Sequence, residues 1–169
     1  KLKCNIIMKN KKIVLVAVFA LLTIILSGCF EKDMAMNSPK EDGSYHYPNK
    51  DLGFSMDLPA EFIYFQTQSK DSKEITKYKD IEIFVPTSDK TYFQEVEGYA
   101  KPIVIRIYSK SDWKKIDNNN NEAVNEFKKI EESKNSVYLI KYWDTAPKDW
   151  EEKWNDEIIK KIEAGFKLE

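Results

Sequence analysis

The single histidine, His46, and two pairs of closely spaced acids are the side chains best suited to catalysis or metal binding. A Ser-His-Asp arrangement would have to use His46, which lies in an expected hairpin without a nucleophile-elbow motif nearby. The paired acids, each separated by one residue, are Asp80 and Glu82, and Glu95 and Glu97. Metal sites need clustered ligands, and no Asp-x-Asp-x-Asp-Gly calcium loop occurs. We therefore predict no catalytic residue and no metal site, with His46 packed or at the surface and the acids solvated.

Two further patterns bear on enzymatic function. Carboxylates that converge in space can support hydrolysis, so a carboxylate-dependent hydrolase remains an alternative. The five glycines are scattered singly, and none belongs to a Gly-rich loop that could cradle a phosphate. No cofactor is therefore predicted.

An apolar segment, Ile13–Leu26, separates a basic stretch that begins at Met8 from the thiol of Cys29. Its only polar residue is Thr23, and its length suits the roughly 7–15 residues of a signal-peptide core. It is shorter than the ~20 apolar residues that span a bilayer. Small residues then precede the thiol and suit the pocket of a signal peptidase. The closing quartet is Leu26, Ser27, Gly28 and Cys29.

This quartet resembles the lipobox of bacterial lipoproteins. The resemblance implies that Cys29 is lipidated through its sulfur and becomes the mature N-terminus, with Leu26, Ser27 and Gly28 recognised by the signal peptidase. We accordingly expect residues 1–28 to be a signal peptide that truly starts at Met8. A diacylglyceryl group would hold the chain at the extracytoplasmic face of a cell membrane, since each buried CH₂ contributes ~0.8 kcal/mol. An uncleaved N-terminal membrane helix is the alternative.

The composition of residues 29–169 limits the possible partners. The segment before it contains lysines and no acidic residue, so the mature chain is more acidic than the whole, whose formal charge is −1. A mildly acidic chain of mixed charge suggests no nucleic-acid partner. The chain has two cysteines, Cys4 and Cys29, so the mature domain has no disulfide and must be stabilised by packing.

Residues 29–43 are polar and aperiodic, which predicts a flexible tether, and residues 44–169 are expected to form one globular domain. Period-two alternation predicts an opening hairpin, and a nearly continuous apolar run predicts a central strand at 102–108. Residues 67–77 are predicted to form a loop. The predicted strands are 45–47, 54–58, 61–66, 81–85, 102–108, 136–143 and 166–168.

Helical signals are fewer. Residues 87–100 are ambiguous between a helical face and an ordered loop, and a short helix is predicted at 114–115 with a cap at 111–113. Residues 118–121 are predicted to form a loop, and apolar spacing predicts a helix within 122–132. The clearest helix is expected after Asp144 and Thr145, with Trp150, Trp154, Ile158 and Ile162 on one stripe and Gly165 ending it.

Both ends of the domain resemble PsbP-like domains. The similarity lies in the segment Tyr47–Pro59, with its polar turn and Gly-Phe-Ser, and in Ile158–Leu168, a terminal helix followed by Phe-Lys-Leu. The resemblance implies an α+β fold in which an antiparallel sheet is flanked by helices as an α/β/α sandwich. The family includes photosystem II subunits and bacterial lipoproteins of unassigned activity. Glu61-Phe62 stands where the family often has a tryptophan, and only the fold is carried over.

Aromatic residues support the functional hypotheses. Trp150 and Trp154 share a stripe with isoleucines, which favours core packing, whereas Trp113 lies among charges and is the speculative ligand contact. We expect a lipoprotein anchored in the membrane by the lipid on Cys29, acting without catalysis by binding an envelope protein or another envelope component. A carbohydrate- or peptidoglycan-binding module is the second hypothesis, and the hydrolase is the third.

Overall fold

The computed structural model describes residues 39–74, 76–116 and 122–169. The predicted signal peptide, lipidated cysteine, most of the tether and the 118–121 loop lie outside these residues. The domain mixes α and β structure and its sheets are antiparallel, as predicted. Two separate sheets are present, where the resemblance implied a single sheet between layers of helices. Within the described ranges, no helix is both long enough and apolar enough to cross a membrane.

The smaller sheet contains β1 (Tyr45–Asn49), β2 (Phe54–Leu58) and β8 (Phe166–Leu168), in the order β1-β2-β8. The predicted opening hairpin and final strand are therefore confirmed. The hairpin turn contains the 3-10 helix η1 (Lys50–Leu52), whose first turn is capped by the Asn49 side chain. Gly53 follows with φ +71°, a conformation that glycine adopts without steric cost.

The larger sheet has the strand order β3-β4-β5-β7-β6. Its strands are β3 (Gln66–Asp71), β4 (Tyr78–Pro86), β5 (Tyr99–Ser109), β6 (Lys128–Glu132) and β7 (Ser136–Tyr142). The apolar run at 102–108 does form the central strand. Every residue of 81–85 in β4 is buried, with Ile81, Ile83 and Val85 in the core and the charged Glu82 on the opposite face.

Both edge strands differ from the sequence prediction. The 3-10 helix η2 (Ala60–Phe62) stands where a strand was predicted, and β3 occupies part of the predicted loop. The predicted helix at 122–132 is a single short turn, α3 (Glu122–Asn125), followed by β6. Edge strands face water on several sides, so their polar composition lacks the apolar periodicity that reveals a strand.

The remaining helices are short. Helix α2 (Lys110–Trp113) begins earlier than predicted because Ser109, not Ser111, accepts from the Asp112 amide as its cap. Helix α4 (Asp156–Gly165), in contrast, starts later than predicted, at a cap formed by Asn155. The predicted stripe therefore breaks, since both tryptophans lie before the helix. Residues 87–98 form an ordered loop.

Gly165 ends α4, though not by a left-handed cap. A Cβ atom there would lie 2.3 Å from the carbonyl oxygen of Asp57 on β2. The glycine therefore allows the end of α4 to lie directly against the smaller sheet, a close approach that any side chain would prevent.

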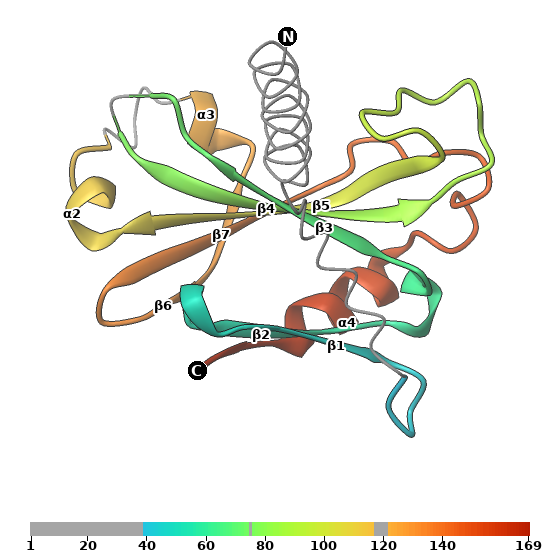
Figure 1. Ribbon diagram of the computed structural model, residues 1–169, viewed down its shortest axis with the longest axis horizontal. Coiled ribbons are helices and arrows are strands. Elements are labelled where there is room, and N and C mark those ends of the chain that lie inside the picture. The colour runs from blue at the N-terminus through green and yellow to red at the C-terminus, as the bar shows by residue number, and fades with distance from the viewer. Residues whose placement is uncertain (1–38, 75, 117–121) are drawn as a thin grey trace, which may run out of the picture. The chain divides into compact units, whose positions relative to one another are not determined.

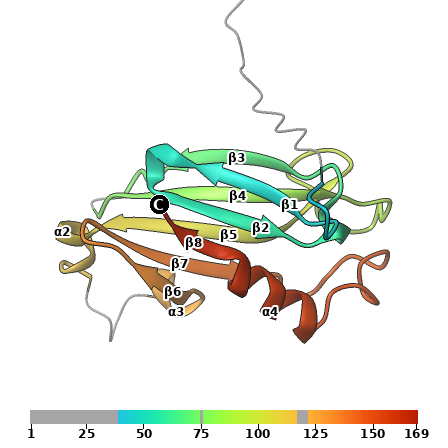
Figure 2. The same cartoon turned by 90° about the horizontal axis from the view of Figure 1, so that it is seen from below.

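The hydrophobic core lies between the two sheets and α4. Figures 1 and 2 show the smaller sheet and α4 on the same side of the larger sheet. Aliphatic residues of β4 and β5 meet aromatic and aliphatic residues of β2, with Ile158 and Ile162 from α4 and Trp150 from the preceding loop. The core placement predicted for Trp150 is confirmed. The opposite face of the larger sheet is free of this core and carries the site described below.

Candidate binding hollow on the outer face of the larger sheet

Every second residue of the central strands of the larger sheet faces the core. The residues between them lie on the outer face of the sheet. Ile81 and Ile105 are paired in register and buried in the core, whereas their neighbours Asp80 and Arg106 are paired on the outer face. Period-two alternation sends neighbouring side chains to opposite faces. The outer face is therefore charged at the centre of the sheet.

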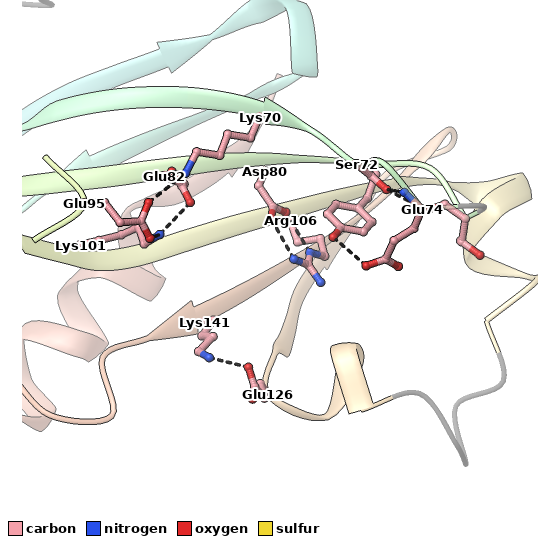
Figure 3. A network of polar contacts seen from close by, with 12 residues as sticks. Lys70, Ser72, Glu74, Asp80, Glu82, Glu95, Lys101, Arg106, Glu126 and Lys141 are labelled. Carbon is pink, nitrogen blue, oxygen red and sulfur yellow. Dashed lines mark hydrogen bonds and ion pairs between the residues drawn. The ribbon is translucent and has the colours of Figure 1, made fainter. Parts of the chain in front are cut away.

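Four charged residues form a closed ring on this face, with signs alternating around it (Figure 3). Glu82 is 5% exposed, and its two oxygens lie 2.6 Å from Lys70 Nζ and 2.8 Å from Lys101 Nζ. Both lysines also contact Glu95 in the 87–98 loop. The hydrogen bond from Lys101 lowers the pKa of Glu95, with burial opposing it and Lys70 adding to it. The ring joins β3, β4 and β5 to the loop.

A second ion pair lies beside the ring. The guanidinium of Arg106 donates from Nε and Nη2 to the two oxygens of Asp80, each at 2.8 Å. It lies 3.8 Å from the ring centroid of Tyr78 and 4.3 Å from that of Phe127, which places the cation between two aromatic faces. Burial alone would lower the pKa of Arg106, but Asp80 raises it. Arg106 is thus a permanent, fully engaged cation.

Hydrogen bonds fasten two loops to each other at one end of this face. The Asp149 carboxylate accepts from Thr87 Oγ1 at 2.7 Å and from the backbone and side chain of Ser88. Asp89 in turn accepts from the backbone amide of Lys148 at 3.1 Å. Figure 1 shows the 87–98 loop and the loop after β7 side by side at the same end of the larger sheet. Both loops are therefore fixed in position.

Between these loops and the residues after α3, the outer face is hollowed by an open cavity of about 520 Å³. Six of its seven charged lining residues form ion pairs with one another. These pairs are Asp80–Arg106, Glu82–Lys101 and Glu126–Lys141. The seventh, Asp144, is solvent-exposed and has no ion-pair or hydrogen-bond partner among the residues described. The hollow therefore retains one uncompensated negative charge.

Aromatic side chains line the end of the hollow near Asp144. The ring centroid of Tyr92 lies 6.3 Å from that of Trp143, with the rings inclined at 69°. Phe93 is 79% exposed, the most exposed of the large hydrophobic residues described. Burial and then the charge of Asp144 raise the pKa of Tyr92. We call the group Tyr92, Phe93, Trp143 and Asp144 the aromatic corner.

The indole nitrogen of Trp143 is buried, and among the described residues it has no hydrogen-bond partner. A buried donor without an acceptor costs about 1–3 kcal/mol. The Trp143 ring packs against Trp150 and Trp154, with centroids 5.7 Å and 4.9 Å away. This packing fixes the indole in the wall of the hollow.

The residues weighed in the sequence analysis, including the speculative contact Trp113, lie apart from the hollow or are paired within it. His46 Nδ1 lies 2.7 Å from Asp57, which also binds two lysines, on the smaller sheet. Trp113 is partly buried, and its ring centroid is 5.7 Å from that of Tyr108 in a small satellite cluster. Asp80 and Glu82 share one face and are ion-paired, and the prediction that these acids are solvated is wrong for Glu82, which is 5% exposed.

Sequence reasoning missed the aromatic corner. The adjacent aromatics Tyr92 and Phe93 were visible within the ambiguous 87–100 segment, but their proximity to Asp144 depends on contacts between distant loops. Among the described residues, no group of three or more His, Cys, Asp or Glu side chains could hold a metal ion.

Comparisons of this chain with family models, with curated proteins and with solved structures found no match.

Proposed function

We propose that this chain is a lipoprotein of the bacterial cell envelope, held at the extracytoplasmic face of a membrane by lipid on Cys29. The support comes from the sequence: a basic start, an apolar segment of signal-peptide length and the quartet Leu26, Ser27, Gly28 and Cys29. Signal peptidase would cleave before the cysteine. Two acyl chains would then anchor the protein stably, since a single chain binds a membrane only marginally.

The domain would act as a non-catalytic binding module for an envelope component. The observation that carries this proposal is the hollow, whose volume of about 520 Å³ is typical of small-ligand sites. Hydrogen bonds join the two loops at its rim, and an exposed aromatic residue, Phe93, lines it. Aromatic side chains are common anchors of binding sites.

The hydrolase alternative has no specific support from the hollow. A general acid for glycoside hydrolysis has a raised pKa. The pKa of Glu95 is instead lowered by Lys101 and Lys70, and Asp80 is held by the bidentate guanidinium of Arg106. These contacts give both carboxylates a structural role as partners of the neighbouring cations.

A glycan is one envelope component that the hollow would suit. Sugars stack on aromatic faces, and Phe93 and Trp143 line the hollow whereas Trp113 packs against Tyr108. The proposed contact therefore moves from Trp113 to Phe93. A glycan-binding module remains the second candidate.

We also propose that the domain is PsbP-like. The supporting features are the opening hairpin of β1 and β2, the terminal helix α4 and the final strand β8. The low helix content and the two separate sheets distinguish it from the single sheet that the resemblance implied.

The test uses the full chain, purified in nonionic detergent, in thermal melts against peptidoglycan fragments, glycans, calcium and zinc. A ligand at ~100 times its dissociation constant adds ~2.7 kcal/mol, which corresponds to a shift of several degrees. We expect an envelope fragment to raise the melting temperature in wild type and in Tyr64→Ala, but not in Phe93→Ala. Tyr64 is the matched control, since it is 66% exposed and does not line the hollow. Turnover of a fragment, or a shift that Phe93→Ala retains, would contradict the proposal.

A further inference from the structure

We propose that the aromatic corner binds an alkylammonium group, such as the side-chain amine of a lysine in a peptide. This inference rests on the proposed function, because it names the chemistry that the same hollow would recognise. Three observations carry it: the charge left over in the hollow, the aromatic rings that line the same hollow and the hydrogen bonds between the loops that hold both.

The first observation is the sign of the charge left over. The hollow is lined by four carboxylates and three cations, and its three cations are all paired with carboxylates of the same hollow. Asp144 is left without a counter-ion in the part of the chain that the structure describes. An anionic ligand would have to separate an existing ion pair, whereas a cationic ligand would complete one. Charge complementarity therefore selects a cation.

The second observation is the arrangement of aromatic rings beside this carboxylate. Ammonium groups are attracted to the faces of Trp, Tyr and Phe within about 6 Å of the ring centroid. The rings of Tyr92 and Trp143 pack edge to face, inclined at 69° with centroids 6.3 Å apart, and both line the hollow. Phe93, next in sequence to Tyr92, supplies a third, exposed ring. Aromatic rings that line the same hollow as an unpaired carboxylate suit an alkylated cation better than a hydrated metal ion.

The third observation is that the corner is held in place before any ligand binds. Tyr92 donates from its hydroxyl to the carbonyl oxygen of Thr145 at 3.1 Å, which links the two halves of the corner directly. Asp89 accepts from the Lys148 amide and thus joins the same two loops a second time. A preorganised site loses little conformational entropy on binding, so a small ligand can be held by few contacts.

The experiment follows the indole NH signal of Trp143 by NMR in the full, ¹⁵N-labelled chain in nonionic detergent. The cationic probes are tetramethylammonium and Nα-acetyl-lysine methylamide, with sodium chloride at matched ionic strength as the blank. The neutral probe is Nα-acetyl-norleucine methylamide, which keeps the alkyl chain and lacks the charge. We expect a saturable shift with both cationic probes and at least a tenfold weaker response to the neutral one. Equal affinity for lysine and norleucine probes, or no saturable shift, would overturn the inference.

Variants assign the effect to the corner. Asp144→Asn should weaken binding of both cationic probes about tenfold, and Phe93→Ala should weaken it several-fold. Asp51→Asn, an exposed carboxylate on η1 that does not line the hollow, should leave affinity unchanged. An Asp144→Asn protein that binds as wild type would refute the proposal. If an uncharged glycan instead binds in a Phe93-dependent manner, the ammonium inference fails while the binding function stands; if no probe or envelope fragment binds, both fail.

Discussion

The inner face of the larger sheet is sealed by aliphatic side chains, whereas its outer face carries ion pairs and an open hollow. Both faces are built from the same strands, because consecutive residues of a strand point to opposite faces of the sheet. Ile81, Ile83 and Ile105 point into a core shared with the smaller sheet and α4. The outer neighbours instead pair with one another and with the loops at the rim. One face closes the fold, and the other positions a site.

This difference shows how a buried charge can contribute more to the positioning of a loop than to the stability of the fold. Glu82 is nearly as inaccessible as the core isoleucines, yet it contacts two lysines, and both of them reach Glu95 in the 87–98 loop. Apolar contacts have no preferred direction, whereas ion pairs fix which loop residue meets which strand. The outer face therefore uses charge to hold the loop that carries Phe93.

The largest expected effect comes from truncation of the inner face. Ile105→Ala should lower the free energy of unfolding by about 2–5 kcal/mol, because it leaves a cavity in a fully buried position of the central strand. Val104→Ala, one residue away on the outer face and half-buried, should cost about 1 kcal/mol or less. Urea denaturation of both variants measures the two values. Equal costs would mean that the two faces do not differ as described.

An intermediate effect is expected from the pair at the centre of the outer face. Asp80→Asn keeps the shape of the side chain but leaves the Arg106 guanidinium without its bidentate carboxylate, which should cost about 2–4 kcal/mol. The matched control is Asp71→Asn on β3, where the carboxylate is 79% exposed and pairs with Lys79. This control should cost less than about 1 kcal/mol. A cost at Asp80 no larger than at Asp71 would show that the outer pair is not structural.

The smallest effect is confined to the rim and to low pH. Hydrogen bonds from Thr91 and the Lys148 amide lower the pKa of Asp89 from 3.8 to about 2. A carboxylate whose pKa is lowered by folding stabilises the folded state above pH 3.8, and this contribution is lost as the pH falls toward 2. The hydrogen-exchange protection of the Thr91 and Lys148 amides should therefore decrease across that window, while the amide of Ile105 stays protected. Rim protection that persists to pH 2 would contradict the assignment.

The strands that border the core were predictable, and the edges of the larger sheet were not. Alternation or continuous apolar residues revealed β2, β4, β5 and β7, because burial on one or two faces imposes a pattern on the sequence. Strand β3 is polar throughout, and β6 has one apolar residue, so neither carries such a pattern. The last helix was predicted to start too early because Trp150 and Trp154 are spaced four residues apart, as on a helix. Both tryptophans instead pack against the core from the loop before α4.

The candidate site was less predictable than the fold for a different reason. The acids Asp80 and Glu82 were recognised as a pair, but their cations lie on other strands and become partners only through strand register. Phe93 and Asp144 are far apart in the sequence, and they line the same hollow only because the loops that carry them are bonded to each other. Loop-to-loop hydrogen bonds leave no periodic signal.

We propose that the envelope ligand of this protein binds in the outer-face hollow. The most direct measurement places a photo-crosslinking amino acid at position 93 or at position 64 of the full chain, in intact bacterial cells. Both positions are exposed, and Phe93 alone of the two lines the hollow. We expect a discrete adduct from position 93 that Asp144→Asn diminishes, and no such adduct from position 64. An adduct from position 64 with none from position 93 would contradict it.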